Sequence, residues 1–307
     1  MVDIKYIVIS GGGPTGLLSY GAIQYLSKEK FWELKNIKGI YGCSIGSYLA
    51  IVLSLGYDWE WLNDYFIKRP WNKIISSNQL SFIDAFNKKG LFGEEIVSEM
   101  LLPLLSAKDL SKTITLKQLY EYNHIDIHLY TTNINTSNFS KVDISHSTHP
   151  DLTVIKAISM SMAYPFIFKP VFINDDCFID GGLLNNYPVN DCLSQTKCLE
   201  EEILAFKNIW IMNNDNTNTN TDLNHNIINE QSSSIIDYLV VLLKKMQNEI
   251  NTENLQKEVK YTVRCLVEDL DNYQSWLKAL SCEEMRCKLI KNGNYHAKLF
   301  LSYINNL

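Results

Sequence analysis

Two segments near the start of the chain follow the same pattern, in which an apolar strand leads into glycines and then into a helix. Residues 6–10 are apolar and β-branched, as is typical of a strand buried on both faces of a parallel sheet. They lead into the glycine-rich residues 11–16 and then into a helix predicted over residues 17–30. A second strand, residues 37–40, leads through residues 42–46 into another predicted helix. This order predicts a β-α-β-α unit and therefore an α/β fold.

The handedness of such units brings the two glycine segments together. A strand–helix–strand connection is almost always right-handed, and its two strands are parallel. Both glycine segments follow the carboxyl ends of their strands, so we expect them at the same edge of the sheet. Ser44, in the middle of the second segment, should therefore lie close to the glycine-rich loop.

The second glycine segment matches the pattern G-x-S-x-G through Gly42, Ser44 and Gly46. This pattern is typical of a sharp strand-to-helix turn that exposes a nucleophilic serine, because side chains two positions before or after the serine would collide. The following helix would direct its free N–H groups and its positive dipole end toward the serine. An ordinary strand-to-helix turn is the alternative, since short Gly/Ser patterns also occur by chance.

The glycine-rich loop admits two interpretations. Gly11, Gly12 and Gly13 carry no side chains and can present backbone N–H groups to a developing oxyanion. With Gly16, the loop also fits the G-x-G-x-x-G fingerprint of dinucleotide-binding proteins. That fingerprint needs an acidic residue at the end of the second strand. Here the nearest acid, Glu33, precedes that strand, so we favour the oxyanion loop.

A carboxylate later in the chain is a candidate partner for the serine. A hairpin is predicted from residues 166–173 and 177–179, and its second strand ends at Asp180. Two glycines follow, which let other backbone approach the carboxylate. Asp180 is then either a residue that stabilises its own loop or the partner of a reactive group. Asp175 and Asp176 are ordinary turn residues, and the three acids do not have the spacing of an EF-hand calcium loop.

No metal or cofactor site is indicated. The seven cysteines form no C-x-x-C pair, and we expect free, mostly buried thiols. Histidines gather in a strand predicted over residues 124–133 and in a later turn, but no acidic residue is placed to complete a metal site. We therefore expect surface or loop histidines at His124, His128, His146 and His149.

Composition narrows the possible partners and the location. The apolar fraction of 46% is ordinary for a globular protein, and the net charge of -6 argues against nucleic-acid binding. The sequence has no signal-peptide pattern, and its longest apolar run, about residues 48–55, is far too short to span a bilayer. These features predict an intracellular protein, cytoplasmic or peripheral to membranes.

The remaining segments are expected to support the site. Residues 57–122 are predicted to be mostly helical, with an aromatic cluster near their start that is either core or an apolar lip touching lipid. Residues 183–189 are predicted to be a loop. In the C-terminal part we expect a helix from residue 235, a strand over residues 261–267 and helix again over residues 271–305, in two pieces around Gly293 and its two neighbours.

Four stretches, in the same order along the chain, resemble the patatin-like lipid acyl hydrolases. Residues 11–16 are similar to that family's oxyanion loop, and residues 42–46 are similar to its serine elbow. Residues 160–168 are similar to its small-residue helix end that leads to a proline. Residues 180–186, from Asp180 to Asn186 with Pro188 following, match its D-G-G/A segment. The resemblance covers about residues 4–212.

This resemblance implies a three-layer α/β/α fold with a central, mostly parallel sheet. It implies a Ser–Asp dyad, with Ser44 as the nucleophile and Asp180 as its base, and neither metal nor cofactor. The residues agree, because only His225 and His296 follow Asp180 and neither lies in a context suited to a triad. The implied activity is phospholipase A-like cleavage of fatty-acyl esters through an acyl-enzyme, on a lipid at a membrane or micelle surface.

The resemblance also predicts how the chain is divided. Residues 1–212 would form the catalytic core, residues 213–230 a mobile polar loop, and residues 231–307 helices and a strand that complete or flank the same domain. One departure is Thr15, where family members usually carry Arg or Lys. The lost positive charge leaves an alternative open, in which a catalytically impaired patatin fold binds lipid or regulates a partner.

Overall fold

The computed structural model describes residues 3–78, 81–210, 228, 231, 234–253, 257–267, 270 and 273–306. The polar loop expected at residues 213–230 falls almost entirely outside these described residues.

One large sheet organises the fold. Its strands are β1 (Tyr6–Ile9), β2 (Gly39–Cys43), β4 (Asp126–Asn133), β5 (Ser140–Ile144), β7 (Val171–Ile173), β8 (Asp176–Asp180), β9 (Ile203–Trp210) and β10 (Tyr261–Val267). They lie in the order β10-β9-β1-β2-β4-β8-β7, and β5 also pairs with β4. The strands from β10 to β4 are parallel, whereas β5, β7 and β8 pair antiparallel. A two-stranded sheet pairs β3 (Gly90–Phe92) with β6 (Phe166–Phe168).

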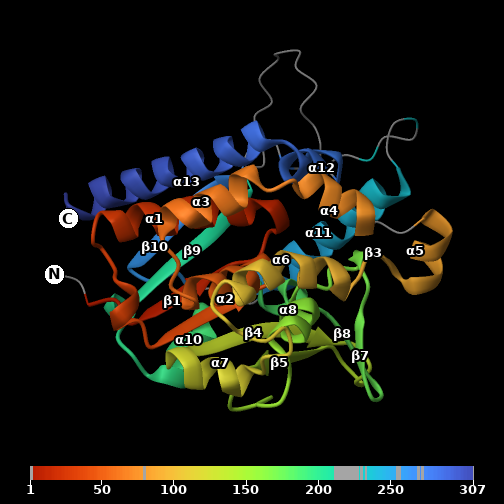
Figure 1. Cartoon of the computed structure of the whole chain (residues 1–307), viewed down its shortest axis with the longest axis horizontal. Coiled ribbons are helices and arrows are strands. Elements are labelled where there is room, and N and C mark those ends of the chain that lie inside the picture. The colour runs from red at the N-terminus through yellow and green to blue at the C-terminus, as the bar shows by residue number, and fades with distance from the viewer. Residues whose placement is uncertain are drawn as a thin grey trace.

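Helices pack on both faces of the large sheet (Figure 1). They are α1 (Gly16–Lys28), α2 (Ile45–Ser54), α3 (Trp59–Lys68), α4 (Trp71–Asn78), α5 (Phe82–Lys88), α6 (Glu94–Ser106), α7 (Leu116–Asn123), α8 (Val154–Ser161), α9 (Gly182–Asn185), α10 (Val189–Thr196), α11 (Ile235–Glu253), α12 (Tyr273–Ser281) and α13 (Glu283–Ile304).

Side chains along each strand alternate between the two faces of the sheet, and each face is covered by a layer of helices. On β1, Ile7 and Ile9 join the main core, which also contains side chains from α1, α2 and α13. Val8, between them, faces the other way and joins a smaller cluster with Val189 and Cys192 of α10. Successive strand residues point to opposite faces of a sheet, so each face needs its own helix layer. The expected α/β fold with a mostly parallel central sheet is confirmed.

Close contact between α1 and α13 explains two glycines inside helices. A Cβ on Gly21 would collide with the carbonyl of Ile290, and a Cβ on Gly293 would collide with the carbonyl of Leu18. Glycine at both positions lets the two backbones approach each other. The helix break expected around Gly293 is therefore wrong, and the interruption lies at Cys282, between α12 and α13.

Two further expectations need correction. Residues 166–173 are not one arm of a hairpin, because β6 turns away to pair with β3 and only β7 pairs with β8. The predicted loop over residues 183–189 contains most of α9 and the first residue of α10.

His128 is not a surface or loop histidine. Its side chain is buried, stacks on the ring of Tyr41 and lies between the carboxylates of Asp126 and Asp143, at 3.2 and 2.9 Å. Burial alone would lower the pKa of His128, but these two carboxylates raise it to about 9. The buried histidine is thus paired with two carboxylates that are partly exposed. The part of the chain described by the structure contains no group of three or more His, Cys, Asp or Glu residues that could hold a metal ion.

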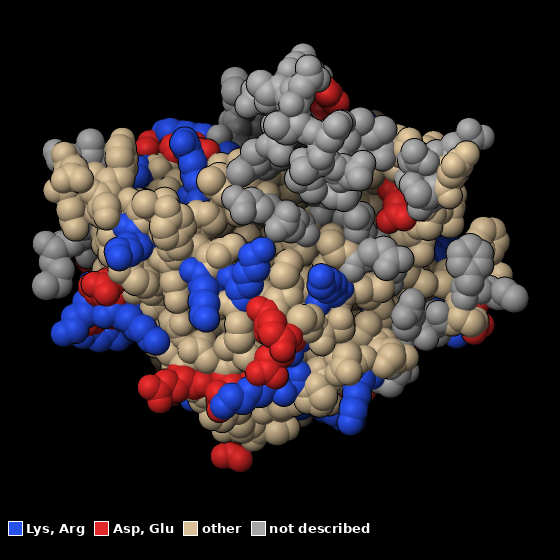
Figure 2. Space-filling model, turned by 90° about the horizontal axis from the view of Figure 1, so that it is seen from above, with Lys and Arg blue, Asp and Glu red and all other residues tan. Residues whose placement is uncertain are grey.

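The aromatic cluster of residues 57–66 belongs mainly to the core, since Leu62, Tyr65 and Phe66 are buried. The seven cysteines are free thiols. On the face uppermost in Figure 1, the described basic and acidic side chains are interspersed and form no patch of one sign (Figure 2). Among the described residues, no helix has the length and apolar character needed to cross a bilayer.

Candidate functional site

The turn after β2 holds Ser44 in a strained backbone conformation. Ser44 has φ 53° and ψ -125°, outside the regions that side-chain-bearing residues normally occupy. The turn is possible because of its flanking glycines: a Cβ on Gly42 would collide with the backbone of Gly46, and a Cβ on Gly46 would collide with the carbonyl of Ile9. The residues predicted to form a nucleophile elbow therefore form a turn of that kind, with Ser44 half-buried at its tip.

The sheet register brings Asp180 to this serine. Along one edge of β4, Cys43 of β2 pairs with Tyr130, and Asp180 of β8 pairs with the next residue, Thr131. On its other edge β4 pairs with β5 over residues 129–133, so β2 and β8 must share one edge and meet end to end. The Ser44 hydroxyl donates a hydrogen bond to Asp180 Oδ2, with 2.6 Å between the oxygens.

The second carboxylate oxygen of Asp180 is also fixed. Oδ1 accepts a hydrogen bond from the Gly182 amide at 2.7 Å, and the Asp180 amide donates to the carbonyl of Ala163 at 2.9 Å. Burial raises the pKa of Asp180 from its ordinary value of 3.8 to about 6, even though the hydrogen bonds from Ser44 and Gly182 act to lower it. A carboxylate with a pKa near 6 is still mostly ionised at neutral pH, and it is a stronger base than an ordinary aspartate.

The glycine-rich loop runs beside Ser44. A Cβ on Gly11 would lie 3.0 Å from the Cβ of Ser44. The Gly11 amide donates to the carbonyl of Asn186 at 3.1 Å, so it is already occupied. Gly12 and Gly13 are half-exposed and have positive φ angles of 153° and 59°, and within the described chain no backbone carbonyl accepts from their amides. Of the three expected oxyanion donors, Gly12 and Gly13 are therefore the available ones.

Two polar side chains stabilise the glycine-rich loop by hydrogen bonds to its carbonyl groups. Thr15 is buried, and its hydroxyl donates to the carbonyl of Gly12 at 3.0 Å. Asn208, at the carboxyl end of β9, donates from its amide side chain to the carbonyl of Gly11 at 3.2 Å. Both bonds fix the carbonyls of the loop. Thr15 thus supports the loop from within and does not present a polar group at its surface.

Ser161 at the end of α8 is a residue to which sequence reasoning gave no role. Its hydroxyl oxygen accepts the Ser44 N–H at 3.0 Å and lies 2.6 Å from both the Ser47 hydroxyl and the Tyr130 carbonyl. Ser161 therefore connects the strained turn to α2 and β4. The sequence did contain a signal for a role of Ser161, because this residue lies in the small-residue stretch 160–168 that carries part of the family resemblance.

Comparison with known proteins identifies this arrangement. A family model described as Patatin-like phospholipase matches residues 7–193, which include the glycine-rich loop, Ser44, Ser161 and Asp180. This chain belongs to the patatin-like phospholipase family.

Viral proteins are among the relatives of this patatin-like chain. It is 31% identical over 190 residues to "Uncharacterized protein R571" of Acanthamoeba polyphaga mimivirus, covering 61% of each chain. It is 29% identical over 187 residues to "Probable lipid hydrolase 463L" of Invertebrate iridescent virus 6, covering 61% of this chain and 62% of that protein. The chain thus spans about 61% of the length of these curated relatives.

A solved structure also resembles it. VipD from Legionella pneumophila aligns with 94% of this chain and 67% of its own, with a TM-score of 0.48 and 15% sequence identity.

An apolar cavity of about 130 Å³ begins next to the Ser44 turn of this patatin-like chain. Gly13 of the glycine-rich loop and Ile45, which follows Ser44, line one part of it. Its walls continue through side chains of α2, α3, α4, α6, β3, β6 and α12, among them Leu49, Phe66, Trp71, Phe92, Met100, Phe168 and Trp276. The lining also includes Arg286 of α13, whose guanidinium donates to the carbonyls of Leu280 and Ile67. The remaining lining is apolar and suits an alkyl chain.

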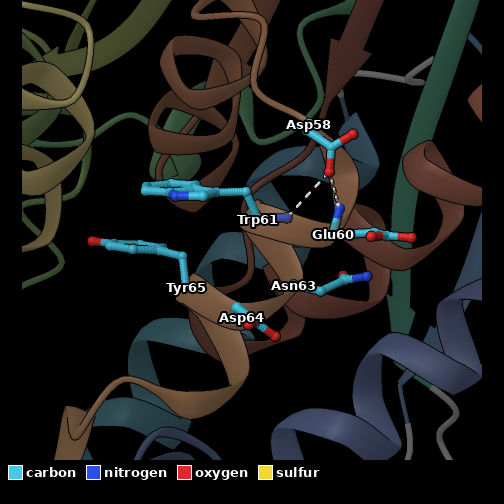
Figure 3. Close-up of a pocket in the computed structure, with 6 residues that line it drawn as sticks. All are labelled: Asp58, Glu60, Trp61, Asn63, Asp64 and Tyr65. Atoms are coloured by element: carbon cyan, nitrogen blue, oxygen red, sulfur yellow. Dashed lines mark hydrogen bonds between the residues drawn. The ribbon is translucent and has the colours of Figure 1, made fainter.

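A second hollow, of about 770 Å³, lies on α3 and contains none of the predicted site residues (Figure 3). The rings of Trp61 and Tyr65 point the same way and stack with centroids 5.7 Å apart, while Glu60 and Asn63 point to the other side. Asp58 caps the helix by accepting from the amides of Glu60 and Trp61 at 2.8 and 3.3 Å. These contacts account for the group as support for α3, and it contains no nucleophile with a base.

Proposed function

We propose that this protein is a lipid acyl hydrolase that cleaves fatty-acyl esters through a Ser–Asp dyad. The observation that carries the proposal is the 2.6 Å hydrogen bond from Ser44 to the buried Asp180, beside an apolar cavity. Membership of the patatin-like phospholipase family and similarity to a probable viral lipid hydrolase support the same substrate class.

In the first half-reaction, Ser44 Oγ attacks the ester carbonyl carbon and Asp180 Oδ2 accepts the hydroxyl proton. The carbonyl oxygen becomes negatively charged, and the amides of Gly12 and Gly13 are the proposed donors that stabilise it. Removal of one such donor typically costs about 2.7–4 kcal/mol of transition-state stabilisation. The tetrahedral intermediate then collapses, the bond to the alkoxide breaks, and the leaving alcohol takes the proton from Asp180.

In the second half-reaction, a water molecule attacks the acyl-enzyme and Asp180 again accepts the proton. Collapse of the second tetrahedral intermediate releases the fatty acid, and the proton returns to Ser44 Oγ. The same carboxylate therefore acts as base and then as acid in both half-reactions. Its pKa of about 6 is close to neutral pH, which suits both accepting and returning a proton. The apolar cavity would hold the acyl chain, since its lining begins at Ile45 next to the nucleophile.

The test is hydrolysis of a chromogenic fatty-acyl ester together with labelling by a serine-reactive fluorophosphonate. Wild-type protein should turn over the ester and take up the label, and Ser44→Ala should do neither. Ser54→Ala is a matched control that should keep both properties, because Ser54 lies at the far end of α2 and its hydroxyl donates to the carbonyl of Ile51 at 2.8 Å. Unchanged turnover in Ser44→Ala, or a folded wild-type protein that takes no label, would contradict the proposal.

A further inference from the structure

Three exposed phenylalanines lie at the end of the molecule where Ser44 and Asp180 meet (Figure 1). Within the described chain four phenylalanines are exposed: Phe86 at 81%, Phe139 at 54%, Phe166 at 43% and Phe172 at 52%. Single exposed apolar side chains are common and need no explanation, whereas a contiguous group of large ones marks an interaction surface. We propose that Phe86, Phe166 and Phe172, with Lys88 and Lys89, form a docking surface for a phospholipid membrane. This inference rests on the proposed hydrolysis of lipids.

These five residues lie close together although they come from different elements. Gly90, which follows Lys89 directly, pairs with Phe166 across the β3–β6 sheet. Phe172 pairs with Cys177 across the β7–β8 hairpin, and Lys89 is near enough to Cys177 to influence the pKa of its thiol. In Figure 1, α5, β3 and β7 lie at the same end of the molecule. We call this group the phenylalanine rim.

The rim extends past the carboxyl edge of the sheet. Asp180 is level with Ser44, and β8 reaches it from Asp176, four residues earlier. At roughly 3.4 Å per residue, the β7–β8 turn therefore lies on the order of 10 Å beyond the dyad. A flat surface that approaches the dyad from this side would meet the hairpin and its neighbours first.

The rim is continuous with the apolar cavity. Ile167 and Phe168 of β6 line the cavity, and Phe166, the residue before them, is exposed. Ala163, three residues before Phe166, accepts the hydrogen bond from the Asp180 amide. At most about 11 Å of chain thus separates the exposed ring from the segment that holds the carboxylate. The strand β6 therefore runs from the exposed ring of Phe166 to the wall of the cavity. A lipid chain that leaves a bilayer could follow this apolar path into the cavity.

Phe166 also has an unusual backbone. Its φ of 68° is in the left-handed region, which is a genuine outlier for a bulky residue and costs on the order of a few-fold to a hundred-fold in local conformational preference. Such strain is commonly found where structure serves a function. Here it accompanies an aromatic ring that stays on the surface.

The charges of the rim are balanced, with two lysines on one side and two aspartates in the β7–β8 turn. Lys88 and Lys89 are exposed, and neither has an ion-pair partner among the described residues. Carboxylates are also present: Asp175 and Asp176 are exposed in the β7–β8 turn, and Asp176 accepts a hydrogen bond from Asn133 at 2.7 Å. The two lysines offset these two charges at the surface that would face the membrane. Lysines beside inserted aromatic rings favour anionic headgroups. The net charge of -6 gives no general attraction to them, so binding would depend on this surface.

The experiment measures partitioning into vesicles of phosphatidylcholine, with and without phosphatidylserine. All variants carry Ser44→Ala, so that binding is measured without turnover and does not depend on the proposed reaction. Phe86→Ser combined with Phe172→Ser should lower partitioning into both kinds of vesicle by at least about tenfold. Lys88→Gln combined with Lys89→Gln should lower binding only to the anionic vesicles, by about fivefold for each lysine.

Leu199→Ser is the matched control, because Leu199 is 68% exposed and lies just before β9 at the opposite edge of the sheet. It should bind as the parent protein does. With Ser44 intact, the Phe86/Phe172 variant should keep wild-type hydrolysis of a soluble short-chain ester and lose hydrolysis of vesicle lipid. Unchanged vesicle binding by that variant, an equal loss in Leu199→Ser, or a dimer that depends on Phe86 and does not bind vesicles would each overturn the docking surface.

Discussion

Replacing Asp180 with asparagine should sharply lower activity and at the same time stabilise the folded protein. The native pKa of about 6 lies above the ordinary value of 3.8 because the charged carboxylate is buried. A group whose pKa is raised by folding stabilises the protein below its unfolded pKa and loses that contribution as the pH rises through its folded pKa. The wild-type protein should therefore lose stability between about pH 4 and pH 7, and the asparagine variant should not show this loss.

The size of the effect follows from the two pKa values. The difference between 3.8 and about 6, at about 1.36 kcal/mol per pKa unit, corresponds to about 3 kcal/mol above pH 7. Asparagine keeps an acceptor for the Gly182 amide, so the structural cost of the change is small. Loss of the general base should lower kcat by about 10²–10⁴-fold. The ionised Asp180 carboxylate is thus expected to lower the free energy of unfolding, although the proposed activity depends on it.

The assay is urea unfolding of both proteins at several pH values from 4.5 to 8, since the difference between their unfolding free energies isolates the Asp180 contribution. Cys43 and Tyr164 lie near Asp180, but burial keeps their pKa values well above this range. Asp175→Asn, in the exposed turn before the same strand, is the control and should follow the wild-type pH dependence. A stability difference between wild type and Asp180→Asn that does not grow with pH would refute the reasoning.

Four further outcomes are expected. The kcat/KM for a soluble ester should rise with pH along an apparent pKa of about 6, and a profile that is flat from pH 5 to 8 would count against Asp180 as the base. Ser161→Ala should lower kcat by about ten- to a hundredfold with little change in KM, because it leaves the Ser44 N–H without its acceptor; equal changes in both parameters would indicate another role. His128→Asn should be less stable than wild type at pH 6, with a difference that shrinks as the pH rises through about 9, where His128 loses its proton, as urea unfolding can test. Gly293→Ala should lower the melting temperature despite a helix-propensity gain of about 1 kcal/mol, because its Cβ meets the Leu18 carbonyl.

Sequence reasoning succeeded where short-range patterns determine the structure. The strand, glycine and helix order around Ser44 predicted parallel strands and one shared edge, and the register of β1 and β2 has that form. Sequence reasoning was less successful where the same residue type can serve two different structural roles. Gly293 in a polar helix reads as a break, but glycine also permits close helix packing, and only the position of α1 distinguishes the two.

Long-range neighbours explain the remaining differences. His128 alternates with apolar residues as an outward-facing strand position would, and its burial depends on Asp143 of β5 and on the ring of Tyr41. The Gly11 amide is not free to act as an oxyanion donor, because it bonds to the Asn186 carbonyl, 175 residues away in sequence. No local pattern carries such information, because these contacts form only after the sheet has assembled.

The helix contact at Gly21 and Gly293 has a consequence for shortened versions of the protein. The family match ends at residue 193, yet α13 packs directly on α1, the helix that starts at the end of the glycine-rich loop. A chain cut at that boundary would lack β9 and β10, leave one edge of β1 unpaired and uncover an apolar side of α1. Open strand edges favour aggregation. Recombinant fragments meant for lipid assays should therefore keep the final helix.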